Sequence, residues 1–203
     1  MTRTIGLILA GGRSTRMGGN DKAFIALKDK RLLAHLLDRL KPQVDEVAIN
    51  SNADAERFHE FGVSVIPDIL RDHLGPLAGI HAGLTAYPDD SLLTVAVDLP
   101  FIPRDLATRL KAQSDGSHCC YASDGKSHAL AILWPPGMAT TVEQFLRESK
   151  HSIQEWLRVH GTPVVFQPTP EADIQCNVNS PEDLEKAELF LSGTSGAENK
   201  KGG

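Results

Sequence analysis

Short apolar runs alternate with longer amphipathic segments along most of the chain. Several of these runs are continuous stretches of Val, Ile, Leu and Ala without polar alternation, which is typical of parallel strands covered on both faces. The strands that this pattern predicts span residues 5–10, 44–50, 63–67, 92–97, 119–122, 128–134 and 163–167.

The segments between the apolar runs have the spacing of amphipathic helices. The first has leucine at positions 32, 33, 36, 37 and 40, which places five apolar side chains on one face of a helix. In the last, Ser180 is a candidate N-cap, Pro181 follows at the first helical position, and two acids fill the first turn. The predicted helices span residues 31–40, 53–61, 77–87, 104–113, 141–148, 153–160 and 181–191.

Strands that alternate with helices indicate right-handed βαβ units. We therefore predict a three-layer, Rossmann-like α/β fold with a mostly parallel central sheet. The pair Asp124-Gly125 lies between two apolar runs and predicts a tight hairpin, which adds a small antiparallel element. We expect residues 1–192 to form a single domain and residues 193–203, which lack apolar anchors, to form a disordered tail.

The composition narrows the classes of function. The chain has 203 residues and a formal net charge of −5, which argues against nucleic acid and against a membrane surface as partners. The apolar run at 5–10 is too short to span a bilayer and a polar loop follows at once, so we expect a cytoplasmic protein. Three cysteines without a Cys-x-x-Cys pair indicate neither a disulfide framework nor a structural zinc site.

The loop after the first strand, residues 9–22, is the strongest functional feature. It contains four glycines, whose backbone N–H groups can approach an anion closely, together with Arg16 and Lys22. Arg16 can grip phosphate oxygens with a planar fork, and Lys22 offers a mobile ammonium. The loop matches neither Gly-x-Gly-x-x-Gly nor the P-loop pattern, and a glycine-rich loop can also be a plain connection.

Polar residues also lie at the ends of three other predicted strands. Asp98 comes after an apolar strand and can serve as an oxygen ligand for Mg²⁺, or it can merely shape a turn. Asp68 and Asn50 are likewise placed to contact a base or ribose, or to stabilise a loop. In a doubly wound sheet, ligands bind beyond the carboxyl ends of the strands. Together these loops favour nucleotidyl transfer, in which charge on a phosphate must be neutralised.

Four sequence blocks resemble the MobA-type molybdenum cofactor guanylyltransferases, a branch of the nucleotidyltransferase superfamily. The loop reads Leu-Ala-Gly-Gly-x-Ser-x-Arg-Met-Gly…Asp-Lys, and the other blocks are Gly-Pro-Leu-Ala-Gly at 75–79, Val-Asp-Leu-Pro at 97–100 and Asn-Val-Asn-Ser-Pro-Glu-Asp-Leu at 177–184. The resemblance extends from residue 5 to about residue 191, and it implies a nucleotidyltransferase fold.

The resemblance implies transfer of GMP from GTP to the terminal phosphate of molybdenum-bearing molybdopterin, with release of pyrophosphate. It assigns catalysis to Arg16, Lys22 and Asp98, and Mg²⁺ binding to Asp98. The implied GTP contacts are Leu9, Ala10, Gly11, Gly12, Arg16, Lys22, Asn50, Asp68 and Asp98. The implied acceptor side comprises Gly79, His128, Asn177 and Asn179. Transient contacts with proteins that supply molybdopterin or mature molybdoenzymes are also expected.

Several alternatives stay open at this point. Relatives that use CTP usually have alanine where this chain has Gly11. On the evidence of this single residue, we favour GTP over CTP. A sugar phosphate could replace molybdopterin as acceptor, and a nucleotide-sensing module without turnover would keep the same pocket. The retention of Arg16, Lys22 and Asp98 favours an enzyme. The chain also departs from the family pattern where Ala129 follows His128.

Overall fold

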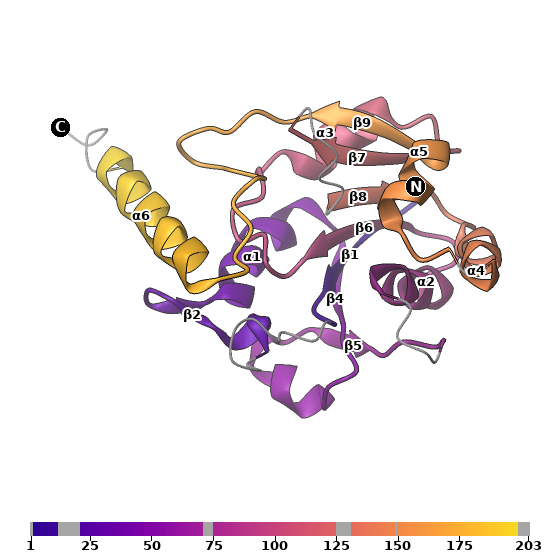
Figure 1. Cartoon of the computed structure of the whole chain (residues 1–203), viewed down its shortest axis with the longest axis horizontal. Helices are drawn as coiled ribbons and strands as arrows, with labels where there is room; N and C mark the ends of the chain where they lie inside the picture. The colour runs from indigo at the N-terminus through magenta and orange to yellow at the C-terminus, as the bar shows by residue number, and fades with distance from the viewer. Residues whose placement is uncertain (1, 12–20, 71–74, 125–130, 149, 199–203) are drawn as a thin grey trace.

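The computed structural model describes residues 2–11, 21–70, 75–124, 131–148 and 150–198, with the backbone alone for 194–198. Within these residues the centre is a seven-stranded sheet with the order β5-β4-β1-β6-β8-β7-β9 (Figure 1). The strands are β1 Thr4–Leu9, β4 Glu46–Asn50, β5 Ser64–Ile66, β6 Ser91–Ala96, β7 Cys119–Ser123, β8 Ala131–Trp134 and β9 Gly161–Val165. The predicted strands are confirmed, with ends that differ by a few residues.

The sheet is mostly parallel, as predicted. β1 pairs in parallel with β4 and β6, β4 pairs with β5, and β7 pairs with β9. β8 runs antiparallel to both of its neighbours, β6 and β7, and is the predicted antiparallel element. The turn that would connect β7 and β8 falls at residues 125–130, outside the described residues.

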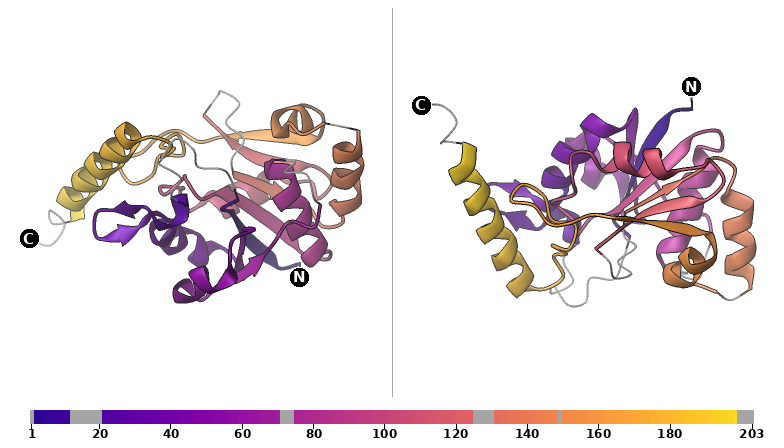
Figure 2. Two further views of the ribbon diagram at one scale, coloured as in Figure 1. Left: turned by 60° about the horizontal axis from the view of Figure 1, so that its bottom comes forward. Right: turned by 90° about the horizontal axis from the view of Figure 1, so that it is seen from above.

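The helices cover both faces of the sheet, which makes three layers. The α-helices are α1 Leu32–Leu40, α2 Pro76–Ala86, α3 Leu106–Gln113, α4 Ala139–Arg147, α5 Ile153–His160 and α6 Pro181–Glu198. Residues of α1 and α3 share one hydrophobic cluster with one face of the sheet, and residues of α2, α4 and α5 share a second cluster with the other face (Figure 2). All five leucines of the predicted stripe in α1 are buried.

Three short 3₁₀ segments complete this part of the chain: η2 Lys22–Phe24, η3 Lys41–Gln43 and η4 Ala55–Phe61. The sequence predicted an α-helix at 53–61, and that prediction is wrong in type. The Asp54 carboxylate accepts from the N–H of Glu56, and Gly62 ends the segment in the left-handed region at φ 60°. The segment between these two ends has seven residues, which is longer than most 3₁₀ runs, and an apolar pattern of this length does not distinguish the two kinds of helix.

The sequence pattern missed a two-stranded sheet, β2 Ala26–Leu27 with β3 Lys30–Arg31, which lies under α6. Leu27 is buried there with Val178 and Ala187 in a third, smaller cluster. Phe190 of α6 stacks on Phe101 with ring centroids 4.6 Å apart. These contacts seat α6 against the edge of the molecule, at the left of Figure 1.

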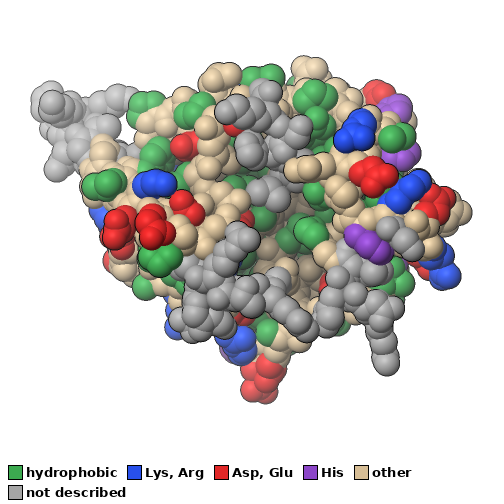
Figure 3. Space-filling model, viewed as in Figure 1, with side chains coloured by type: hydrophobic (Ala, Val, Ile, Leu, Met, Phe, Trp, Pro, Cys, Tyr) green, Lys and Arg blue, Asp and Glu red, His purple; other side chains and the backbone are tan. Residues whose placement is uncertain are grey.

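Helix α6 runs from Pro181 to Glu198, beyond the predicted end at residue 191. Residues 193–198, which we expected to be disordered, therefore continue the helix. Ser192 donates its hydroxyl to the carbonyl of Glu188 and receives a hydrogen bond from Lys28. These bonds hold the helical backbone at the point where the sequence pattern loses its apolar residues. Charged side chains gather on the α6 side in Figure 3.

The three cysteines form no disulfide, in agreement with the sequence. Burial raises the pKa of the Cys119 thiol to about 12 and that of Cys176 to about 11, so both stay protonated near neutral pH. Among the helices in the described part of the chain, none combines the length and the apolar character needed to cross a bilayer.

Candidate active site

Four parallel strands, β5, β4, β1 and β6, end on the same edge of the sheet, and the predicted nucleotide residues follow them. Backbone hydrogen bonds connect the ends of these strands. The N–H of Ala10 donates to the carbonyl of Asn50 at 3.0 Å, and the N–H of Val97 donates to that of Leu9 at 3.1 Å. The structure therefore brings Leu9, Ala10 and Asn50 to one place, with Gly11 adjacent.

Lys22, Asp98 and Asn179 meet at this edge. The Lys22 Nζ lies 2.8 Å from Asp98 Oδ2 and also donates to Asn179 Oδ1. Asn179 in turn donates through Nδ2 to Asn177 Oδ1 at 2.6 Å. The two members of the ion pair are only 21% and 15% exposed, so the pair is stronger than one in open solvent. Two predicted catalytic residues and two predicted acceptor-side residues thus form one connected network.

The carboxylate of Asp98 has an oxygen available for a metal ion. Its Oδ1 is buried and has no hydrogen-bond partner within the described residues, which is a costly arrangement for a carboxylate. Mg²⁺ prefers hard oxygen ligands and is commonly held by one or two carboxylates together with substrate phosphates. The amide oxygens of Asn177 and Asn179 lie in the same network. This donor set fits Mg²⁺.

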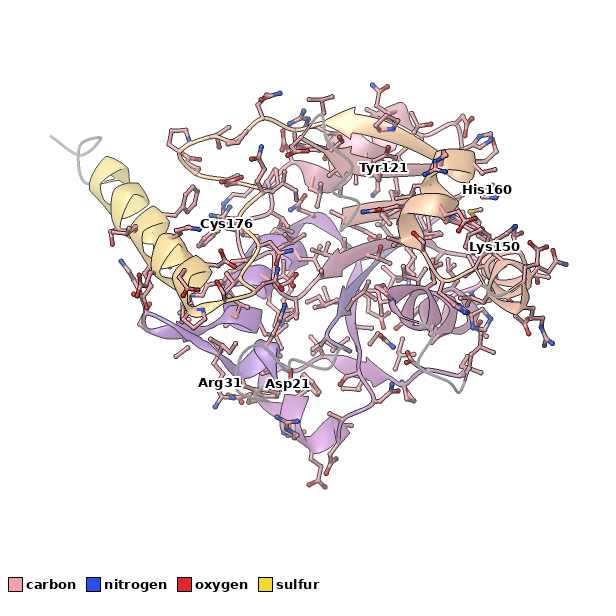
Figure 4. The ribbon with its side chains drawn as sticks, viewed as in Figure 1. Asp21, Arg31, Tyr121, Lys150, His160 and Cys176 are labelled. Carbon is pink, nitrogen blue, oxygen red and sulfur yellow. The ribbon has the colours of Figure 1, made fainter. Side chains whose placement is uncertain are left out.

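The segment of residues 176–179 is attached to Asp98 through the backbone. The N–H of Val178 donates to the carbonyl of Asp98 at 2.9 Å, and Val178 is fully buried. The N–H of Asn179 donates to the Asp183 carboxylate in the first turn of α6. The path from β9 to α6, on which Figure 4 labels Cys176, is thereby held against the carboxyl edge of β6.

The side chain of Asn50 is held by the residues around it. It is 4% exposed, and its Nδ2 donates to the Ile66 carbonyl at 3.1 Å and to Asp68 Oδ1 at 2.9 Å. Gly79 of α2 lies against it, because a Cβ at this position would come within 2.0 Å of Asn50 Oδ1. Sequence reasoning expected Gly79 on the acceptor side, whereas the structure places it beside Asn50, among the residues expected to contact GTP.

The turn that carries Lys22 is fixed from both sides. Asp21 caps η2 by accepting from the N–H of Ala23, and it pairs with Arg57 at 3.3 Å (Figure 4 labels Asp21). The guanidinium of Arg57 also lies 4.6 Å from the centre of the Phe24 ring. Asp21, just before the lysine, and Phe24, two residues after it, therefore both contact Arg57 of η4. No sequence motif distinguishes Arg57, so its role could not be predicted.

Three predicted site residues, Gly12, Arg16 and His128, fall outside the described residues. Both tryptophans, Trp134 and Trp156, are fully buried and serve packing. Trp134 donates to the Thr94 hydroxyl at 3.0 Å, and Trp156 packs against it with ring centroids 5.8 Å apart.

Residues 6–164 match a family model described as "MobA-like NTP transferase domain". The chain belongs to this MobA-like NTP transferase family. A molybdenum cofactor guanylyltransferase of Shewanella woodyi is 39% identical over 184 residues, which are 89% of this chain and 93% of that protein. One of Cereibacter sphaeroides is 39% identical over 193 residues, which are 93% of this chain and 97% of that protein.

Solved structures of low sequence identity have the same fold as this MobA-like chain. The molybdopterin-guanine dinucleotide biosynthesis protein A of Archaeoglobus fulgidus has a TM-score of 0.75 at 21% identity, over 93% of this chain and 98% of that one. A 4-diphosphocytidyl-2C-methyl-D-erythritol synthase of Anaerococcus prevotii has a TM-score of 0.72 at 12% identity, over 94% and 96%. The predicted nucleotidyltransferase fold is confirmed.

The match to the MobA-like NTP transferase family covers Lys22 and Asp98 but ends before Asn177 and Asn179. Alignment with the Cereibacter relative spans 93% of this chain and so extends past the end of the family match. The contacts of Lys22 and Val178 connect this last segment to the matched domain.

Proposed function

We propose that the chain transfers GMP from GTP to the terminal phosphate of molybdenum-bearing molybdopterin, releasing pyrophosphate and forming molybdopterin guanine dinucleotide. The relatives named molybdenum cofactor guanylyltransferase, at 39% identity over most of the chain, support this reaction. The observation that carries the proposal is the convergence of Lys22, Asp98 and Asn179 at the carboxyl edge of the sheet.

The reaction is an exchange of phosphoanhydride bonds. An oxygen of the acceptor's terminal phosphate attacks the α-phosphorus of GTP and forms the new P–O bond. The bond between the α-phosphorus and the oxygen that bridges it to the β-phosphate breaks, and pyrophosphate leaves with the electron pair. The acceptor already carries a phosphate oxyanion, so the protein need not supply a nucleophile. Its task is to place two polyanions together and neutralise the charge that builds up.

Lys22 is placed to neutralise that charge. Its ammonium has partners from two sides, Asp98 and Asn179, and a phosphate oxygen can replace the amide oxygen of Asn179 without moving the lysine far. The Asp98 carboxylate holds the ammonium in this position through a contact of 2.8 Å. Arg16, by the family resemblance, would stabilise the departing pyrophosphate.

We propose Mg²⁺ as the metal ion, held by Asp98 through the oxygen that lacks a partner among the described residues. When bound, the ion withdraws electron density from phosphate oxygens and reduces the repulsion between the two substrates. Asn177 and Asn179 are proposed to orient the acceptor, since their amides already form a chain that ends at Lys22. Contacts with proteins that supply molybdopterin or mature molybdoenzymes stay a prediction.

The test is a pyrophosphate-release assay with the purified chain, Mg²⁺, molybdenum-bearing molybdopterin and each of GTP, CTP and ATP in turn. We expect release with GTP only, and only when the pterin is present, together with a product whose mass equals pterin plus GMP. Release with CTP in place of GTP would contradict the base assignment. Release with a sugar phosphate, but not with the pterin, would contradict the acceptor.

A further inference from the structure

Asn52 forms a two-point contact with Asp68. The Asn52 Nδ2 donates to Asp68 Oδ2 at 2.8 Å, and the Asp68 backbone N–H donates to Asn52 Oδ1 at 2.9 Å. One amide therefore fixes both the carboxylate and the backbone of Asp68. Asn52 itself lies on the surface, so nothing in the core requires an asparagine there.

Asp68, held in this way, in turn contacts the buried side-chain amide of Asn50. Its other oxygen, Oδ1, accepts from Asn50 Nδ2 at 2.9 Å, and the second hydrogen of that amide goes to the carbonyl of Ile66. A primary amide has two hydrogens, so the donors of Asn50 are both used. Rotation of the amide by 180° would bring its oxygen against two acceptors, which is unfavourable.

With both N–H groups of the Asn50 side chain held in this way, its side-chain oxygen Oδ1 lies on the other side of the amide, away from Asp68 and Ile66. This oxygen lies 2.0 Å from the position that a Cβ of Gly79 would take and 3.5 Å from that of Gly11. It thus lies between Gly79 of α2 and Gly11 after β1, and neither of these residues has a side chain. The network therefore presents a hydrogen-bond acceptor, and no donor, from Asn50 to this edge of the sheet.

We propose that Asn52 is a positioning residue that sets nucleobase preference, because it holds Asp68 and Asp68 holds the Asn50 amide with its oxygen toward the base. This inference rests on the proposed use of a guanine nucleotide. The pairing edge of guanine has N–H donors at the adjacent positions N1 and N2, whereas adenine has a single donor group there, the N6 amine, beside an unprotonated N1. A site that offers a fixed acceptor selects the base with matching donors, because the mismatched base leaves polar groups unpaired.

The test compares binding of Mg–GTP and Mg–ATP by calorimetry in five forms of the full chain: wild type, Asn52→Ala, Asn52→Asp, Asp68→Asn, and the combination of the last two. We expect Asn52→Ala to weaken Mg–GTP binding about tenfold and to reduce the preference for GTP over ATP by a similar factor. Asn52→Asp should do more damage, since it sets two carboxylates against each other.

The double variant provides the decisive comparison. The amide introduced at position 68 can donate to the carboxylate introduced at position 52, which reverses that one side-chain bond, and it still accepts from Asn50. Because Asp68 is itself an expected GTP contact, recovery is judged against the single variants, and we expect the double variant to prefer GTP more strongly than either Asn52→Asp or Asp68→Asn. A merely structural role of Asn52 would alter melting temperature and both affinities equally, without a recovery that is specific to GTP.

The matched control is Asp115→Ala. Asp115 also fixes an exposed loop by accepting from the N–H groups of Ser117 and His118, but it precedes β7, at the opposite edge of the sheet. It should leave both affinities unchanged. A wild type that prefers GTP, with the same preference in Asn52→Ala or with no recovery in the double variant, would overturn this inference alone. A wild type that binds no Mg–GTP would overturn the proposed function itself.

Discussion

The ammonium of Lys22 lies 2.8 Å from the carboxylate of Asp98, although 76 positions separate the two residues in the sequence. The third member of the network, Asn179, is 157 positions from Lys22. These residues belong to the turn after the first strand, the carboxyl end of β6 and the segment before α6. Their meeting depends on the parallel order of the strands, which brings the loops to one edge of the sheet.

Asp98→Asn should remove magnesium-dependent turnover. The substitution keeps the shape of the side chain but removes the charge and the carboxylate oxygen that we assign to the metal ion. We expect kcat to fall by about a hundredfold to a thousandfold, the scale for losing one main electrostatic group. The measurement is pyrophosphate release across a magnesium titration, with circular dichroism to verify folding. Wild-type activity in the variant would exclude Asp98 as the metal ligand.

Lys22→Ala should lower kcat by about a hundredfold with a smaller effect on KM, because we assign its ammonium to charge that develops during the reaction. Steady-state kinetics with varied GTP separate the two parameters. Asn179→Ala is a useful companion, since it leaves the Asp98–Lys22 pair in place. If Lys22→Ala raised KM alone, the lysine would bind the ground state and would have no catalytic role.

Gly79→Ala should impair both folding stability and nucleotide binding. The added methyl would lie 2.0 Å from Asn50 Oδ1, so the buried amide must move. Such overpacking costs about 1–3 kcal/mol, and we expect at least tenfold weaker binding of Mg–GTP. The control is Gly193→Ala in α6, where no described atom lies within 4 Å of an added methyl. That change should be neutral or stabilising by up to about 1 kcal/mol.

Arg57→Gln should lower kcat although Arg57 lies outside the reacting groups. Its loss removes one contact from Asp21, which precedes Lys22, and one from Phe24, two residues after it, and small shifts of the proposed catalytic lysine are costly. We expect a decrease of about tenfold, with Arg57→Lys intermediate. Arg31→Gln is the control, because Arg31 also lies over the Phe24 ring but pairs with Glu60. Equal kinetics for both glutamine variants would refute the positioning role.

Stability should fall in mild acid because of His81, which is buried in α2. Burial lowers the pKa of His81 below its ordinary value of 6.5, and the Glu143 carboxylate opposes this effect only in part. The unfolded chain therefore takes up a proton near pH 6.5 that the folded chain resists, so stability is full above that pH and is lost below it. One such proton accounts for at most about 1.4 kcal/mol per pH unit.

The measurement is urea unfolding at pH 7.5 and 5.5 for wild type and His81→Leu. The variant has no imidazole to titrate, so its stability should change less between the two pH values. Equal losses in the two proteins would show that other groups control the acid response.

The strands and most of the helices could be predicted because the buried parallel strands form continuous apolar runs, a pattern that few other structures of this length produce. The small sheet of β2 and β3 was missed because each strand has two residues, one of the four buried and the others exposed, and the turn uses Lys28 at φ 55° instead of glycine. Pattern alone also could not separate an α-helix from the 3₁₀ segment at Ala55–Phe61.

For the candidate site, too, some features could be predicted from the sequence and others could not. Asn50, Asp68 and Asp98 could be found because each lies at the carboxyl end of a predicted strand or directly after it, and a topological rule then places them together. The contacts of Lys22 with Asn179 and of Asp21 with Arg57 could not be found, because they depend on how separate loops pack. The buried oxygen of Asp98, unpaired among the described residues, is likewise visible only once its neighbours are in place.

Asp98 is held through both its backbone and its side chain. Its carbonyl accepts a hydrogen bond from the N–H of Val178, and its carboxylate pairs with the ammonium of Lys22. During translation, the early strands can pair well before residues 176–179 leave the ribosome. The contacts of Asp98 and Lys22 with residues 178 and 179 can form only after that segment has been synthesised. A nascent chain stalled before this point would hold the early strands of the sheet with Lys22 and Asp98 still lacking these partners.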